Sequence, residues 1–243
     1  MEFKKPALGE ILQLAYHYWR RTLLYQVLFT LIYFSLGFTI LYYSGVKLGL
    51  LDLYAGAVEK LRISSQAYVE EVQKIGRSDA AQRYYWIILF TLTFLYPLNL
   101  GLMKIFRKLD LNEKTDFHDL FAGYLGINFL IYTSFHLFWI MVFNLVVPTF
   151  FLAILWVLAT LFAAPLMFFR GMRTFECISI SLTVLRKYPL EILITVFLAV
   201  VIKYIGIFSL VGALFTFPVW NAFIYALYKS IFVENTTNEK VLK

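Results

Sequence analysis

Three polar residues inside an otherwise apolar run are the sharpest candidates for chemistry in this sequence. His136 lies eight residues from both Asn128 and Asn144, and eight residues displace two side chains by only about 80° around a helix. The three would therefore form a polar stripe. Ionisable groups at membrane depth often mark a pathway or a relay. Separate interhelical hydrogen bonds, worth about 0.6 kcal/mol each, are the simpler interpretation and the preferred one.

A Phe-x-x-Pro motif occurs three times and ends at Pro97, Pro165 and Pro218. A proline within a membrane helix frees a backbone carbonyl that neighbouring groups must satisfy. Asn99 and Asn221 follow two of these prolines, so we expect them to meet the freed carbonyls. Broken helices also bind substrates in transporters, but packing kinks are the preferred interpretation here.

Three carboxylates hold similar places ahead of apolar runs: Glu10, Asp119 and Glu176. A threefold bundle would let them bind a cation. Helix capping or pairing with nearby arginines is preferred, because carboxylates at an interface are well solvated. Basic pairs follow two of them after ten residues, at Arg20–Arg21 and Arg186–Lys187. We expect these basic pairs to contact anionic lipid headgroups.

Several kinds of chemistry find no support in the sequence. The single cysteine, Cys177, allows neither an intrachain disulfide nor a cysteine-based metal site. There is no glycine-rich phosphate loop, no Ser-His-Asp set and no zinc-ligand spacing. We therefore expect no catalytic residue, no metal and no cofactor.

The composition of the chain indicates that its apolar segments are surrounded by lipid. Of the 243 residues, 61% are hydrophobic and 15% are charged, whereas soluble domains carry about 25% charged residues. So many apolar residues exceed what one soluble core can bury, so lipid must cover the rest. The net charge of +7 falls at the ends of apolar runs, which favours the positive-inside rule over nucleic-acid binding.

The sequence predicts an all-α polytopic membrane helix bundle with six spans, each close to the 20 residues or so that cross a hydrocarbon core. The expected spans are 22–43, 84–103, 127–147, 149–169, 188–206 and 213–232. Amphipathic interfacial helices are expected at 6–19, 109–126 and 170–187; the first has protein docking as its alternative. Fifteen Lys or Arg fall on the side of the termini and seven on the other, which predicts that both termini are cytoplasmic.

Residues 44–83 are the one sizeable segment expected to face water. Six basic and five acidic residues nearly cancel there, and apolar residues are spaced loosely as a helix face. That expected face comprises Leu51, Tyr54, Val58, Leu61, Tyr68, Val72 and Ile75. One or two amphipathic helices outside the membrane are expected. A cap on the bundle is preferred, and a docking site for a membrane-complex partner is the alternative.

The six spans are interpreted as one integral membrane domain, residues 1–243, with a threefold internal repeat. The first unit is 6–108 and carries the insertion 44–83, the second is 109–170 and the third is 171–232, ahead of a polar tail at 233–243. No removable signal peptide is expected at the N-terminus.

The last third of the chain contains a pattern of short motifs. It runs through Ala164-Pro165, Glu176, Ser179-Ile180-Ser181, Arg186-Lys187, Gly206, Gly212, Phe217-Pro218 and Tyr225-x-x-Tyr228. In these residues the chain resembles the bacterial six-helix membrane proteins related to the membrane domain of glycerophosphodiester phosphodiesterases. The resemblance implies a six-helix membrane fold and no established activity, because the phosphodiesterase chemistry of that family lies in a separate soluble domain.

The sequence is compatible with three functions from different classes. The leading one is a non-enzymatic component of the bacterial inner membrane that holds lipid, most favourably anionic lipid, or stabilises a partner. The second is a transporter or channel-like subunit, which predicts a polar cavity around His136, Asn144 and Asn221. The third, a lipid-modifying enzyme, needs converging carboxylates or histidines, and the sequence does not indicate such a group.

Overall fold

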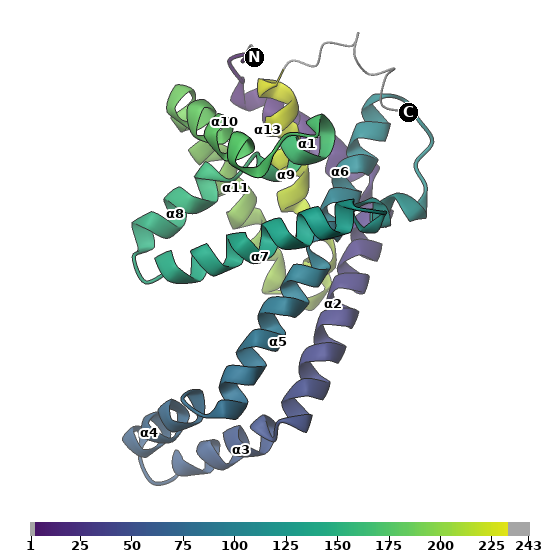
Figure 1. Cartoon of the computed structure of the whole chain (residues 1–243). Helices are drawn as coiled ribbons and strands as arrows, with labels where there is room; N and C mark the ends of the chain where they lie inside the picture. Colours follow the sequence, from purple (N-terminus) through teal and green to yellow (C-terminus); the bar gives the residue numbers. More distant parts are fainter. Residues whose placement is uncertain (1–2, 233–243) are drawn as a thin grey trace. The chain divides into compact units, whose positions relative to one another are not determined.

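The computed structural model describes residues 3–232, apart from the side chain of Leu210, and its regular elements are helices (Figure 1). They are α1 Leu8–Arg21, α2 Leu23–Lys47, α3 Leu50–Lys60, α4 Ser65–Gly76, α5 Asp79–Leu95, α6 Pro97–Asp110, the 3-10 helix η1 Phe117–Tyr124, α7 Asn128–Val146, α8 Phe150–Ala159, α9 Ala163–Arg170, α10 Thr174–Lys187, α11 Pro189–Ile207, α12 Leu210–Thr216 and α13 Val219–Ile231. The polar tail expected at 233–243 lies outside the described residues.

Six segments of the described chain are long and apolar enough to cross a membrane. They are Leu23–Lys47, Asp79–Asp110, Asn128–Val146, Phe150–Arg170, Pro189–Ile207 and Val211–Ile231. The expected all-α polytopic fold is confirmed, and the chain is an integral membrane protein. The second segment is longer at both ends than the expected span. Within the stretch 109–126, the amphipathic pattern forms a 3-10 helix.

The chain folds as two compact units. The larger unit consists of the chain up to Leu31 together with the chain from Pro97 onward, and the smaller unit is Ile32–Tyr96. These units do not follow the three expected repeats, which stay a prediction. We describe each unit by itself.

The three returning spans are each divided into two helices near the Phe-x-x-Pro motif. α5 ends at Leu95 and α6 begins at Pro97, α8 gives way to α9 over residues 160–162, and α12 gives way to α13 at residues 217–218. A proline lacks the N–H that would continue the helical hydrogen-bond ladder, which accounts for the breaks at Pro97 and Pro218. Pro97 and Pro218 therefore mark short interruptions of their helices, whereas Pro165 lies inside α9.

The carbonyls freed beside Pro218 find partners outside their own helix. Thr30 Oγ1 donates to the carbonyl of Leu214 at 3.1 Å, and Trp19 Nε1 donates to the carbonyl of Phe215 at 2.9 Å. Leu214 stands four residues before Pro218, so Thr30 replaces the N–H that the proline lacks. Asn221, which was expected to do this, has a different partner.

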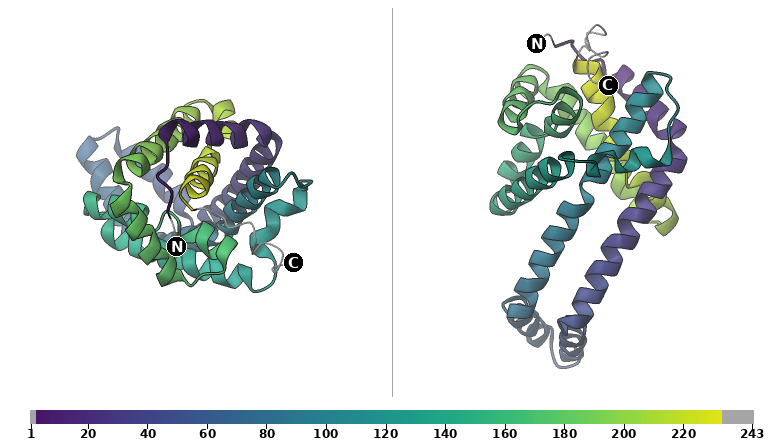
Figure 2. Two further views of the ribbon diagram at one scale, coloured as in Figure 1. Left: turned by 90° about the horizontal axis from the view of Figure 1, so that it is seen from above. Right: turned by 45° about the vertical axis from the view of Figure 1, so that its right-hand side comes forward.

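The core of the larger unit is built from the second halves of the returning spans. Buried residues make up 61% and 56% of the apolar windows in Phe150–Arg170 and Val211–Ile231, but only 17% and 22% of those in α7 and α11. Figure 2 (left) shows α13, in yellow, surrounded by other helices of this unit. α7 and α11 therefore present most of their apolar surface outward, as helices that face lipid do.

The smaller unit contains the outer part of α2, the helices α3 and α4, and α5. Ser64 and Ser78 cap α4 and α5, because their hydroxyls accept hydrogen bonds from the backbone N–H groups of Ala67 and Ala81. Gly49 has a positive φ of 68°, and this left-handed residue turns the chain sharply from α2 into α3. Residues 44–83 thus contain the two helices that were expected at most, together with the end of α2 and the start of α5, which were not expected in this range.

Candidate functional site

Asp110, the last residue of α6, joins three helices of the larger unit. Its carboxylate accepts hydrogen bonds from the hydroxyls of Tyr18 in α1 at 2.8 Å and Tyr225 in α13 at 3.0 Å. The ammonium of Lys229, also in α13, lies 2.5 Å from the same carboxylate. Tyr18 and Tyr225 are buried, so the carboxylate satisfies two hydroxyls that have little access to water.

Asp119 forms the second carboxylate centre, on η1. Its side chain is 6% exposed and lies 3.1 Å from Lys104 Nζ and 2.8 Å from Lys108 Nζ, both on α6. It also accepts a hydrogen bond from the backbone N–H of Asp116, which completes a capping box at the start of η1. Burial raises the pKa of the Asp119 carboxyl, but the hydrogen bonds from both lysines and from Asp116 outweigh burial and bring the pKa below its ordinary value.

Two glycines allow η1 to lie directly against α6. A Cβ on Gly101 would come within 2.0 Å of the carbonyl oxygen of Leu120, and one on Gly123 would come within 2.5 Å of the carbonyl oxygen of Pro97. Only a residue without a side chain fits such an approach. This contact brings Asp119 within reach of the two lysines.

Two arginines lie over a cluster of aromatic rings that joins α9 and α13. The Arg107 guanidinium lies 4.9 Å from the ring centroid of Phe169. The Arg170 guanidinium lies 5.5 Å from the centroid of Phe232, and its Nε donates to the Tyr228 hydroxyl at 3.3 Å. Phe169 itself packs on Tyr228, with centroids 5.6 Å apart. These contacts hold both guanidinium groups at the ends of apolar helices by cation–π attraction.

Together these groups form what we call the charged cluster. It comprises Lys104, Arg107, Lys108, Asp110, Asp119, Arg170 and Lys229. Among these described residues, five side chains are cationic and two are carboxylates. The cations come from the last two turns of α6, from the end of α9 and from the last turn of α13. Such an arrangement can attract an anion at the membrane surface.

The two basic pairs predicted to contact lipid are differently placed. Arg20 and Arg21 are exposed in the last turn of α1, where they line an open hollow with Gln13, Tyr16 and His17. Arg186 and Lys187 are exposed in the last turn of α10, and the Lys187 ammonium lies 5.7 Å from the Phe3 ring. Phe3 lies before the N-terminus of α1, whereas Arg20 and Arg21 lie at its C-terminus, about 21 Å away along the helix axis by its rise per residue. The structure therefore does not bring the two pairs together.

The three residues expected to form a polar stripe lie on α7, but each has different surroundings. Asn128 is the first residue of α7, and Asn144 donates to the carbonyl of Ile140 within its own helix at 2.7 Å. The His136 ring is half-buried and stacks on Trp139, with centroids 5.8 Å apart. Their participation in a polar path stays a prediction.

Asn99 and Asn221 lie together in the interior of the larger unit. The Asn221 amide donates to Asn99 Oδ1 at 2.9 Å, which links α6 to α13 three or fewer residues after their prolines. This side-chain pair couples two of the three helix breaks. Both asparagines lie beside the helix breaks, as expected. Asn221, however, donates to the side chain of Asn99 on the neighbouring helix and not to a freed carbonyl.

The three carboxylates ahead of the apolar runs have different environments. Glu10 lies 3.8 Å from Lys4, not beside an arginine as expected, while Glu176 is exposed on α10. Among the described residues, no group of three or more His, Cys, Asp or Glu side chains is arranged to hold a metal ion. Cys177 is buried.

Sequence reasoning missed the centre of the charged cluster. The sequence placed Asp110 in the amphipathic stretch expected at 109–126, Tyr225 in the family resemblance and Lys229 among the basic residues on the side of the termini, without relating the three to one another. A usable signal was present, because a carboxylate at the very end of a lysine-rich apolar helix needs partners. The partner helix follows more than 100 residues later, so the pairing itself was invisible in the sequence.

No protein-family model, no curated protein and no solved structure matches the chain. The resemblance to the six-helix membrane family therefore stays a prediction. The structure itself defines the class of this protein. The chain is a polytopic α-helical membrane protein, and its charged cluster of basic side chains and aromatic rings lies at the ends of three helices.

Proposed function

We propose that this chain is a non-enzymatic component of the bacterial inner membrane that binds anionic lipid headgroups at the charged cluster. Stabilisation of a membrane-complex partner through residues 44–83 is the second part of the proposal. The observation that carries the lipid-binding part is the convergence of five cationic side chains at the ends of α6, α9 and α13.

Two physical properties favour a phosphate group as the ligand. Arg107 and Arg170 present planar donor groups, whose geometry matches phosphate oxygens. Each basic residue near an anionic membrane surface contributes about 1 kcal/mol of attraction. Because both guanidinium groups already lie on aromatic rings, they lose less side-chain freedom when they bind than mobile lysines do.

The charge distribution also supports an orientation. Each of the three returning helices ends on basic residues, on the side expected to hold the termini. Anionic lipids give the cytoplasmic leaflet its negative surface potential. We therefore propose that the charged cluster and both termini face the cytoplasm.

The test is native mass spectrometry of the full chain purified in mild detergent, with the bound lipids identified. In the double variant Arg107→Gln and Arg170→Gln, we expect the retained anionic lipid to fall by about thirty-fold, which corresponds to about 2 kcal/mol. The matched control is Lys60→Gln with Lys74→Gln, which removes two exposed cations from α3 and α4.

Folding is checked in the same samples by the thermal unfolding midpoint. Equal lipid retention in the double variant, the control and the unaltered protein would overturn the lipid-binding proposal. So would an unaltered protein that retains no lipid. Retention of a co-purifying protein that survives the arginine changes would support the partner-stabilising part alone.

A further inference from the structure

The helices α3 and α4 form a hairpin with a small core of its own. Leu50 and Ala57 of α3 and Ile75 of α4 are buried in this core. Leu48, Tyr68, Val72, Ala80, Ala81 and Tyr84 pack around them. The buried side chains of the hairpin thus pack against one another and against neighbours in the smaller unit.

Three apolar residues of α3 and Leu61, directly after the helix, lie along one side outside this core, contrary to the expected single helix face. Leu53 is also exposed, but it lies about 120° around the helix from the centre of this group. Leu51, Tyr54, Val58 and Leu61 are each between 42% and 55% exposed. They are spaced three, four and three residues apart, which places them along one side of the helix. We call them the apolar face of α3. A contiguous exposed apolar patch marks a surface that contacts a membrane or a partner.

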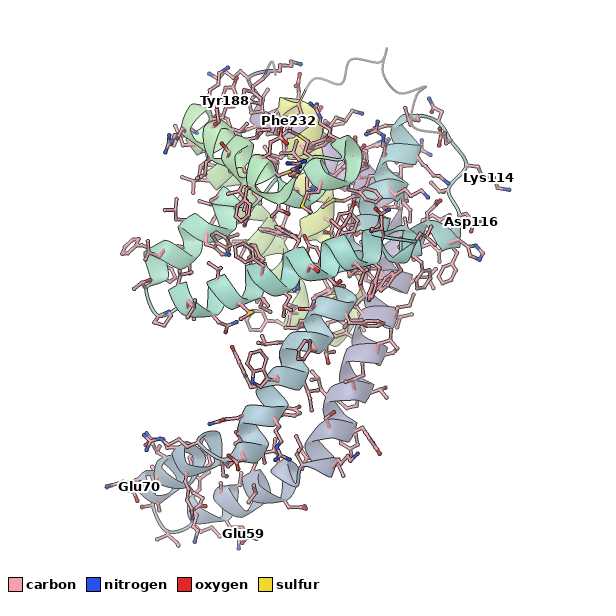
Figure 3. All side chains as sticks on the ribbon, viewed as in Figure 1. Glu59, Glu70, Lys114, Asp116, Tyr188 and Phe232 are labelled. Atoms are coloured by element: carbon pink, nitrogen blue, oxygen red, sulfur yellow. The ribbon has the colours of Figure 1, made fainter. Side chains whose placement is uncertain are left out.

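The polar residues of α3 lie on a different side. Asp52, Gly56 and Glu59 are exposed and follow a spacing of four and three residues, which defines the polar face of α3. Glu59 lies on the side of the hairpin away from α2 and α5 (Figure 3). The apolar face is therefore turned away from the side that carries these acidic groups.

The outer surface of α4 contrasts with that of α3 within the same hairpin. Its exposed residues are mainly polar, and they pair with one another along the helix: Gln66 donates to Glu70 at 3.1 Å, and Lys74 lies 3.8 Å from Glu71. Such pairs suit a helix side in contact with water. The asymmetry indicates that α3 and α4 meet different solvents.

Aromatic residues mark the level at which the hairpin begins. Tyr42 and Tyr43 near the end of α2, and Tyr85 and Trp86 near the start of α5, are all exposed. The two helix ends lie side by side, because a Cβ on Gly45 would come within 3.7 Å of a side-chain atom of Tyr84. Exposed Tyr and Trp at the ends of spans are typical of the membrane–water interface.

We propose that α3 lies in the plane of the membrane interface, with Leu51, Tyr54, Val58 and Leu61 inserted toward the lipid acyl chains and α4 on the water side. Three observations converge on a lipid surface as the occupant. The apolar face follows a lipid-spanning helix after a two-residue turn, it starts at the level of the aromatic residues, and its partner helix is polar outside. Amphipathic helices of this kind bury their apolar side at the headgroup–acyl boundary.

The inference does not depend on lipid binding at the charged cluster, since it concerns other residues and requires no anionic headgroup. Because the apolar face of α3 meets lipid, the polar side of α4 is left for the partner that the docking interpretation of residues 44–83 requires.

The test places single spin labels on the full chain in vesicles of phosphatidylethanolamine and phosphatidylglycerol. Tyr54→Cys and Val58→Cys report the apolar face, and Gly56→Cys and Glu59→Cys are the matched controls on the same helix. All four positions are exposed, so the label should leave the hairpin core intact. Burial raises the pKa of the native Cys177 thiol to about 12, which protects it from labelling, and a Cys177→Ala background removes any residual signal.

Accessibility to oxygen, which concentrates in lipid, is compared with accessibility to a water-soluble nickel complex. We expect labels at Tyr54 and Val58 to favour oxygen by several-fold and labels at Gly56 and Glu59 to favour nickel. Nickel access at all four positions would overturn the proposal in favour of a water-facing cap. Immobile labels at Tyr54 and Val58 that neither reagent reaches would overturn it in favour of a protein partner or a second copy.

Discussion

The basic residues of the charged cluster and the two basic pairs occupy equivalent positions, since both stand in the last turns of helices, yet their surroundings differ. Lys104 and Lys108 lie against a buried carboxylate, and Arg107 lies over an aromatic ring. Arg20 and Arg21, in contrast, are exposed at the end of α1. The charged cluster is fixed by tertiary contacts, whereas the basic pairs are exposed and only Lys187 among them is described beside a ring of another segment, that of Phe3.

This difference separates two kinds of electrostatic attraction. Exposed and mobile cations attract an anionic surface diffusely, and salt screens that attraction over about 8–10 Å. Cations held in one geometry by rings and carboxylates can select a ligand by shape as well as by charge. We therefore expect changes in the charged cluster to alter folding and lipid retention strongly, and changes in the basic pairs to alter both weakly.

The largest effect is expected from Gly101→Ala, which attacks the support of the charged cluster. The added methyl group would overlap the backbone of Leu120, so η1 must move away from α6 and Asp119 must leave its lysines. We expect a destabilisation of about 3 kcal/mol, measured as a lower thermal midpoint in detergent. The control is Gly9→Ala in α1, where nothing lies within 4 Å of the added Cβ and alanine favours the helix. Equal midpoints for the two variants would contradict the close contact.

Asp110→Ala should give the next largest effect. It leaves the buried hydroxyls of Tyr18 and Tyr225 without their acceptor, which costs about 2–3 kcal/mol. Asp110→Asn keeps an acceptor oxygen and should cost less than half as much. The difference between the thermal midpoints of the two variants measures the cost of losing the acceptor, because both variants remove the charge. Equal losses for the two variants would show that the charge dominates.

Asp119 provides a pH-dependent comparison within the charged cluster. Its pKa lies below the ordinary value in the folded protein, so its contribution to stability is fully present above the ordinary aspartate pKa of about 3.9 and is lost as pH falls through the lowered value. We expect the thermal midpoint of the unaltered protein to fall more steeply at acidic pH than that of Asp119→Asn. Parallel pH profiles would contradict the ion pairs with Lys104 and Lys108.

The smallest effect is expected from the basic pairs. In the variant that changes Arg20, Arg21, Arg186 and Lys187 to Gln, the thermal midpoint should move by about 1–2 °C or less, because exposed substitutions rarely change stability. Lipid retention should fall less per charge removed than in Arg107→Gln with Arg170→Gln. A larger fall per charge would place the headgroup site at the basic pairs and reverse the comparison.

Much of the fold followed from periodicity and composition, and particular residues show where this reasoning stops. The apolar runs located six segments of spanning length, and Pro97 and Pro218 located two helix breaks. The donors at the second break could not be inferred, because Thr30 and Trp19 lie about 190 residues away in the chain. Likewise, the spacing of Leu51, Tyr54 and Val58 indicated a helix face but not which face is buried.

The sequence by itself determined that this chain is helical, spans a membrane and carries its positive charge at helix ends. These properties depend on the length of apolar runs and on local chemistry, which a linear sequence records. The tertiary structure decided which charges are held and which are exposed. Asp110 meets Tyr225 and Lys229, and Arg170 meets Tyr228, only when α6, α9 and α13 pack together. Close packing of distant helices is set by side-chain shape and by glycines such as Gly101, whose contacts no local pattern records.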